Sequence, residues 1–87
     1  SVAIEAIRLL ITAAHRKNTE EVAIEVEQQV ADFLNNKKRK EITRIEDEAE
    51  VVVRINARTD VGPEHMIIKA IDGSGGETKI SVLADSK

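Results

Sequence analysis

The chain opens with a segment, residues 2–17, in which apolar side chains recur every three or four positions. This spacing predicts an amphipathic helix. Its apolar residues gather on one face or beside it: Ala3, Ile4, Ile7, Leu10, Ile11 and Ala14. Asn18 is the predicted stop, because Asn tolerates the left-handed backbone conformation that ends many helices. His15 is expected to be a surface residue in the last turn, where the helix dipole favours a cation.

Strict alternation replaces helical spacing in residues 21–26. Val22, Ile24 and Val26 lie on one side, and Glu21 and Glu25 lie on the other. A period of two with one apolar side predicts a half-buried strand.

Residues 30–46 are the centre of the chain, because a basic segment is framed there by apolar residues. Helical spacing returns with Val30, Phe33 and Leu34, lapses over residues 35–40, and resumes at Ile42 and Ile45. The gap is either a turn between two short helices or the solvated side of one kinked helix. Two adjacent Asn residues compete for backbone hydrogen bonds, which slightly favours a break.

Three further strands are predicted after this segment. Residues 51–55 contain a β-branched run, residues 66–71 follow a loop at 56–64, and residues 78–83 follow a Gly-rich hairpin turn at 72–77. Residues 84–87 are expected to fray.

The element order α-β-α(α)-β-β-β predicts an α+β two-layer sandwich, with the helices on one face of a mixed sheet. The first two strands are joined by a helical crossover, so they should be parallel, either adjacent or one position apart. The predicted core consists of Ile7, Leu10, Ile24, Val30, Phe33, Leu34, Ile42, Ile45, Val53 and Ile55.

The composition of the chain limits the classes of function that it could have. The 87 residues predict one small domain, residues 1–87, and a start at Ser1 suggests either a domain cut from a longer protein or a processed product. The chain has no Cys, which excludes disulfides and thiolate metal sites and is compatible with the cytoplasm. Nothing resembles a signal peptide or a membrane span. A net charge of −3 and a single aromatic residue, Phe33, do not favour an autonomous nucleic-acid binder.

One local exception to the acidic balance is the basic stretch at residues 36–44. Its five cations against Glu41 give a local charge of +4 (five minus one), and they are Lys37, Lys38, Arg39, Lys40 and Arg44. Such a patch predicts contact with phosphate, as in RNA, which would be insensitive to base sequence. The alternatives are a solvated helix face and one half of a salt-bridged interface.

The other acidic residues and the two histidines are expected to have structural rather than chemical roles. The acidic cluster Glu46, Asp47, Glu48 and Glu50 points in several directions on a helix, so we expect a solvated helix end, with ion pairs from Arg44. His15 and His65 have no nucleophile motif near them. No catalytic or metal-binding residue is therefore predicted.

Four segments in order carry a resemblance to a known family. They are the Ile-Arg-Leu-Leu-Ile of residues 7–11, the Lys-Asn-Thr-Glu-Glu-Val of 17–22, the Val-Ala-Asp-Phe-Leu-Asn-Asn-Lys-Lys-Arg of 30–39, and Ile42 with Ile45-Glu46. From Ser1 to about Ile71 the sequence resembles the small domain that follows the catalytic core and zinc-link in bacterial RNase E/G endoribonucleases.

The resemblance implies a non-catalytic role. In the family, the aspartates that hold magnesium and the cysteines that hold zinc lie outside this domain, so no cofactor is expected within the fragment. The implied partners are other subunits or domains of the same cytoplasmic ribonuclease. The alternative is a KH-like RNA-binding module, which lacks the Gly-x-x-Gly turn because residues 35–38 read Asn-Asn-Lys-Lys.

Overall fold

The computed structural model describes residues 2–83, and their side chains through residue 80; the predicted frayed tail at 84–87 lies outside this range. Within it, helices and strands follow one another as α1 (Val2–Ala14), β1 (Thr19–Glu27), α2 (Gln28–Lys37), α3 (Arg39–Ala49), β2 (Val52–Arg58), β3 (Met66–Asp72) and β4 (Glu77–Leu83). The predicted element order is confirmed.

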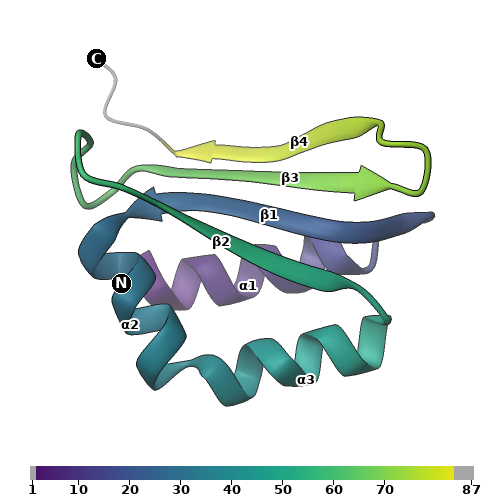
Figure 1. Cartoon of the computed structure of the whole chain (residues 1–87), viewed down its shortest axis with the longest axis horizontal. Helices are drawn as coiled ribbons and strands as arrows, with labels where there is room; N and C mark the ends of the chain where they lie inside the picture. The colour runs from purple at the N-terminus through teal and green to yellow at the C-terminus, as the bar shows by residue number, and fades with distance from the viewer. Residues whose placement is uncertain (1, 84–87) are drawn as a thin grey trace.

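The strands form one mixed sheet with the order β2-β1-β3-β4. β1 and β2 are adjacent and parallel, and the crossover between them is made by α2 and α3, while β3 is antiparallel to both β1 and β4. All three helices described here lie on one face of this sheet (Figure 1). The α+β two-layer arrangement predicted from the sequence is therefore confirmed, and the other face of the sheet is open.

The core fills the space between the two layers. Most of the predicted core residues are buried in it: Leu10, Ile24, Leu34, Ile42, Ile45 and Val53. Three more are partly buried and pack against it: Ile7, Val30 and Ile55. The side-chain alternation of β1 is confirmed, because Val22, Ile24 and Val26 are all fully buried.

Phe33 was wrongly predicted to be a core residue, since its side chain is 44% exposed. α2 buries Ala31 and Leu34, with Val30 beside them. Each helical residue advances about 100° around the axis, so Phe33 lies roughly 200° from Ala31. The helix that buries Ala31 and Leu34 therefore turns Phe33 toward solvent.

α1 ends at Ala14, three residues before the predicted end, and residues 15–17 form turns. Its buried face consists of Ala6, Leu10, Ala13 and Ala14. Ile4 and Ile11, which were expected beside the buried stripe, are 64% and 44% exposed. Asn18 does adopt the predicted left-handed conformation (φ 67°), but in the turn that leads into β1.

The gap at residues 35–40 contains a helix break at one residue, Lys38, between α2 and α3. The slight preference for a break is thus confirmed, but both Asn residues lie inside α2. Lys38 N–H still donates to Leu34 O (3.2 Å), and Ile42 N–H donates to Lys38 O (3.0 Å). Lys38 itself has a non-helical backbone, φ −117° and ψ 12°, and the two helices meet there at a clear angle (Figure 1).

The hairpin between β3 and β4 is confirmed, with its turn at residues 73–76. Asp72 Oδ1 accepts hydrogen bonds from the backbone N–H groups of Ser74 and Gly76, both at 2.9 Å. Gly75 has φ 90°, a conformation that Gly adopts without steric cost. β2 runs on to Arg58, so the predicted loop at 56–64 begins three residues later.

Candidate functional site: the basic junction of α2 and α3

The five predicted contact residues lie together at the junction of α2 and α3. Lys37 ends α2, Lys38 is the connecting residue, and Arg39 and Lys40 open α3, with Arg44 further along the same helix. All five line one open groove, together with Asn35, Asn36 and Glu41. The sequence therefore predicted correctly which cations share a surface, and their contact with phosphate stays a prediction.

Few of these cations are neutralised within the chain. Lys38 Nζ lies 3.5 Å from Glu41 Oε1, and an Arg39 guanidinium nitrogen donates to Asn35 Oδ1 at 3.4 Å. Among the described side chains, the other three cations of the groove have no ion pair. The expected pairs of Arg44 with Asp47 or Glu48 are thus not formed, although the spacing allows them.

The charges of α3 run against its helix dipole. A helix has partial positive charge at its N-terminus and partial negative charge at its C-terminus, so acids stabilise the start and bases stabilise the end. α3 starts with Arg39 and Lys40 and ends with Asp47 and Glu48, and its N-cap residue makes no side-chain cap hydrogen bond. α2 ends at the same junction, with Lys37 in its last turn, so its negative pole offsets the positive pole of α3, and the positive potential of the junction comes from its side chains.

A second ionic cluster, which the sequence did not reveal, joins β1 to the loop after β2. His65 Nε2 lies 2.7 Å from Glu25 Oε2, and Arg58 reaches the same oxygen at 3.2 Å. Arg58 Nε also donates to Asp60 Oδ1 at 2.9 Å. The His65 hydrogen bond, followed by Arg58, holds the pKa of Glu25 below its ordinary value.

The geometry of this cluster favours a structural role over a catalytic one. His65 is 7% exposed, and both His65 and Arg58 are bound to carboxylates, so neither is free to act on a substrate. Glu25 and His65 stand 40 positions apart, on a strand and at the end of a loop. Only the pairing of β1 with β3 brings them together, and the sequence carries no local signal for it.

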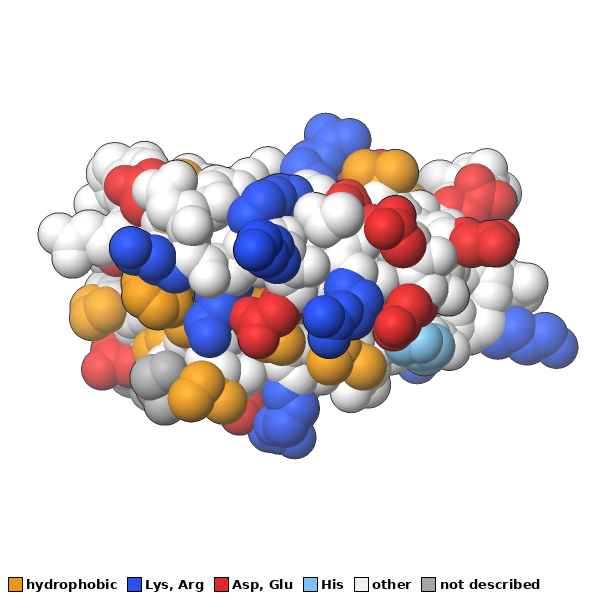
Figure 2. Space-filling model, turned by 90° about the horizontal axis from the view of Figure 1, so that it is seen from below, with side chains coloured by type: hydrophobic (Ala, Val, Ile, Leu, Met, Phe, Trp, Pro, Cys, Tyr) orange, Lys and Arg blue, Asp and Glu red, His pale blue; other side chains and the backbone are white. Residues whose placement is uncertain are grey.

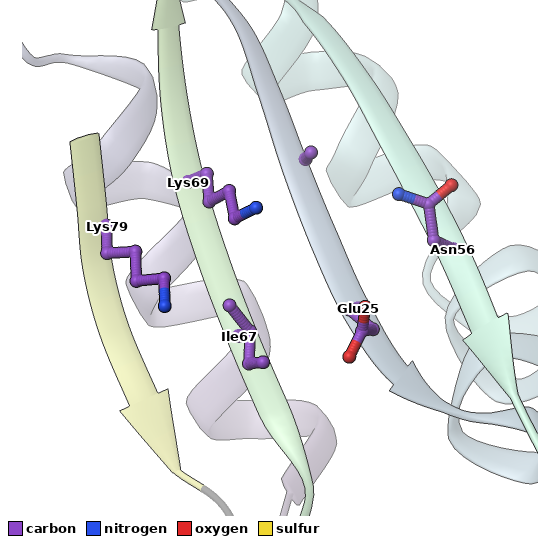
Figure 3. Close-up of a pocket in the computed structure, with 6 residues that line it drawn as sticks. Glu25, Asn56, Ile67, Lys69 and Lys79 are labelled. Atoms are coloured by element: carbon purple, nitrogen blue, oxygen red, sulfur yellow. The ribbon is translucent and has the colours of Figure 1, made fainter. Parts of the chain in front are cut away.

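Beside this cluster, the open face of the sheet has a small hollow over Ala23. Its rim is formed by Glu25, Asn56, Ile67, Lys69 and Lys79, which rise from all four strands (Figure 3). Lys69 and Lys79 are direct cross-strand partners, and Lys69 also pairs with Glu77 at 3.4 Å. The hollow arises because Ala23 is shorter than its neighbours on the adjacent strands.

At the acidic end of α3, one carboxylate makes a contact within the fold. Glu46 uses a carboxylate oxygen to accept the backbone N–H of Val53 at 2.8 Å, which ties α3 to the start of β2. Across the described part of the chain, no group of three His, Asp or Glu side chains is arranged to hold a metal ion. The interpretation of this cluster as a helix end agrees with these contacts.

A comparison with known protein families finds a match over most of the chain. The sequence profile described as "RNase E/G, Thioredoxin-like domain" matches residues 1–71, which is more than half of the chain. The chain therefore belongs to this family of RNase E/G domains. No curated protein matches the chain.

The family description also contains the word thioredoxin. Thioredoxin-type redox chemistry uses a Cys-x-x-Cys pair, and this chain has no Cys. In the described residues, no helix is long and apolar enough to cross a membrane.

Proposed function

We propose that this domain is a non-catalytic assembly domain of an RNase E/G-type endoribonuclease involved in RNA processing and decay. It would follow the catalytic core and zinc-link of its parent, where the magnesium and zinc would be bound. Its partners would be other subunits or domains of the same enzyme in the bacterial cytoplasm. Family membership supports the ribonuclease context, and the surface of the helical layer supports the assembly role.

The observation that carries the proposal is the set of large apolar side chains on the outside of the helices. Ile4, Ile11 and Phe33 are 64%, 44% and 44% exposed, although the core of the domain is filled. Apolar side chains left outside a filled core are suited to cover by a partner. Figure 2 shows such side chains between the charged residues of the helical layer.

The test compares the parent ribonuclease with a version that lacks this domain. We expect deletion to lower the oligomeric state in sedimentation velocity, while each remaining subunit still cleaves a short single-stranded RNA with magnesium. The isolated domain should not cleave that RNA. An unchanged oligomer after deletion would refute the assembly role, and cleavage by the isolated domain would refute the non-catalytic role.

RNA contact by the basic junction is a second candidate function. The observation that favours it is the open groove at the junction, which five cations line, three of them without an ion pair among the described side chains. The KH-like alternative is weaker, because the helices are joined by the single residue Lys38 and no Gly-rich loop lets the backbone approach phosphates.

This second function is tested by Lys38→Glu with Arg39→Glu in the parent protein. We expect weaker binding of labelled single-stranded RNA at low salt. The dependence of affinity on salt should also decrease, by about one unit of log–log slope for each phosphate that the variant no longer binds. Lys17→Glu with Lys79→Glu makes the same charge change on other surfaces and should leave affinity nearly unchanged. Equal affinity of both variants and the unmodified protein would show that the junction does not contact RNA.

A further inference from the structure

β2 is an outer strand of the sheet, so only one of its two long edges is paired (Figure 1). The paired edge faces β1, in parallel register, and no strand of the described chain lies against the other edge. Along a strand, the backbone N–H and C=O groups of successive residues point alternately to one edge and to the other. Every second residue of β2 therefore presents both groups to the free edge, and such an edge is a template for another strand.

The contact made by Val53 shows which residues of β2 face the free edge. Its N–H donates to Glu46 Oε2 at 2.8 Å, so this N–H does not bind β1. Ile55 and Ala57 follow at intervals of two and therefore direct their N–H and C=O groups the same way. The residues between them face β1 instead. Glu46 of α3 thus occupies the first hydrogen-bonding position on the free edge.

Beyond this position, β2 lacks the usual protection of an edge strand. Natural edges are protected by Pro, by unpaired charges, by bulges or by a covering element. β2 contains no Pro and no Lys, and its register with β1 is regular over all seven residues. Its two charged side chains, Arg54 and Arg58, are already bound to Glu21 and Glu25 of β1. The remainder of the edge is therefore open to another extended chain.

The free edge of β2 is complementary to the same edge of a second copy. In an antiparallel pair centred on Ile55, the two Ile55 residues face each other, and Val53 of one copy faces Ala57 of the other. All three residues direct their backbone groups outward, so each N–H meets a C=O. Glu46 obstructs this pair, because its carboxylate already fills the place that the C=O of Ala57 from the second copy would take.

Side chains on the open face of the sheet fit the same register. Arg54 faces Asn56 of the second copy and Val52 faces Arg58, so no like charges are opposed. Val52 is 59% exposed, and the aliphatic stem of Arg58 would cover it. The neighbouring register, centred on Asn56, avoids Glu46 but sets Arg54 directly against Arg58, which is unfavourable.

We infer that Glu46 is a guard of the β2 edge. By holding the Val53 N–H, its carboxylate prevents β2 of a second copy from pairing with this edge in the favourable register. The same contact ties α3 to the start of β2, so the guard is in place when the helical layer is packed on the sheet. This inference concerns the sheet edge and is independent of the proposed assembly role, which uses the outer side of the helices.

Glu46→Ala in this chain tests the guard. In sedimentation velocity, we expect this variant to dimerise about 10-fold more tightly than the unmodified chain, because the favourable register becomes available. Glu46→Gln keeps an oxygen that can accept the Val53 N–H, so its dimerisation should increase less. Glu48→Ala removes an exposed carboxylate from the same helix and should leave association unchanged.

A second substitution shows whether the new dimer uses the β2 edge. Pro has no N–H, and at residue 57, where the N–H faces outward, it removes no hydrogen bond to β1. Glu46→Ala combined with Ala57→Pro should therefore associate like the unmodified chain. Association that came only from reduced stability would persist in the double variant.

Amide hydrogen exchange tests the edge without any substitution. In the unmodified chain, the amides of Ile55 and Ala57 should exchange faster than those of Arg54 and Asn56, which face β1. In the dimer of Glu46→Ala, the first two should become protected. Equal protection of all four amides in the unmodified chain would overturn the inference. So would a Glu46→Ala variant that dimerises no more tightly, or a dimer that Ala57→Pro does not weaken.

Discussion

Glu25 is held between two side chains, one from the far end of β2 and one from the loop beyond it. His65 lies 2.7 Å and Arg58 lies 3.2 Å from the same carboxylate oxygen. These partners, His65 first, lower the pKa of Glu25 below its ordinary value of 4.5. A lowered carboxyl pKa in the folded state means that Glu25 stabilises the fold at pH values above its unfolded pKa. That contribution is lost as the pH falls through the lower, folded pKa.

We therefore predict that Glu25→Gln makes the domain less sensitive to acid. At neutral pH the substitution should lower the free energy of unfolding by about 1 kcal/mol, because an ionic hydrogen-bond network is removed. From about pH 4.5 downward, stability should fall less steeply than in the unmodified chain. Urea unfolding at several pH values measures both effects. Glu64→Gln, at an exposed carboxylate, is the control, and parallel pH profiles for Glu25→Gln and the unmodified chain would contradict the prediction.

Glu25 and Phe33 also show which structural features could not be predicted from the sequence. The alternation of β1 placed Glu25 on the outer side of its strand, which is correct, but not beside His65, because that contact depends on how the loop after β2 returns. Phe33 was assigned to the core because it is apolar and stands at helical spacing with Val30 and Leu34. The face that α2 turns toward the core, with Ala31 and Leu34, decided otherwise, and that face is set by tertiary packing.

At the level of elements, α3 ends in an uncommon way. Its C-cap, Glu50, has φ 57° and ψ 50°. This left-handed conformation is unfavourable for residues that have a Cβ atom. Glu50 N–H donates to Glu46 O, and Val51 N–H donates to the same oxygen at 3.1 Å. The turn from α3 into β2 therefore depends on a conformation for which Gly is better suited.

Glu50→Gly should accordingly stabilise the domain. The substitution removes the steric strain at Cβ, but Gly also gives the unfolded chain more conformational entropy. The net effect is expected to raise the free energy of unfolding by about 0.5–1 kcal/mol. For a domain of this size, that corresponds to a melting temperature higher by roughly 2–8 °C. Asp47→Gly, inside α3, should instead lower the free energy of unfolding slightly, by less than about 0.5 kcal/mol, because Asp is only a little better than Gly in a helix. Similar decreases in stability for both variants would mean that the conformation of Glu50 carries no strain.

Element types were predictable from the sequence to a greater extent than element ends. The period-two pattern of β1 and the helical spacing of α1 follow from local alternation of apolar and polar residues, and both elements exist. The end of α1 at Ala14 and the break at Lys38 depend on hydrogen bonds and packing that the pattern does not encode. The basic junction was predictable because its five cations are close in sequence, whereas the cluster around Glu25 is long-range.

At the scale of the whole molecule, one core joins the two layers. Side chains from all three described helices meet the inner face of the sheet, including Leu10 of α1, Leu34 of α2 and Ile42 of α3. A domain of this size has no second core to compensate for damage to the first. Its total stability is expected to be on the order of 5–10 kcal/mol, so one core substitution can remove a large share.

Leu34 and Phe33 provide the sharpest test of this arrangement, because they are neighbours in sequence and were both predicted to be core. Leu34 is fully buried and Phe33 is 44% exposed. Leu34→Ala should lower the free energy of unfolding by about 2–5 kcal/mol, through reduced apolar burial and the cavity left between the layers. Phe33→Ala, on the solvent side of α2, should cost less than about 1 kcal/mol in the monomer. Urea unfolding at low protein concentration, where association is suppressed, gives both values, and equal decreases would place Phe33 in the core after all.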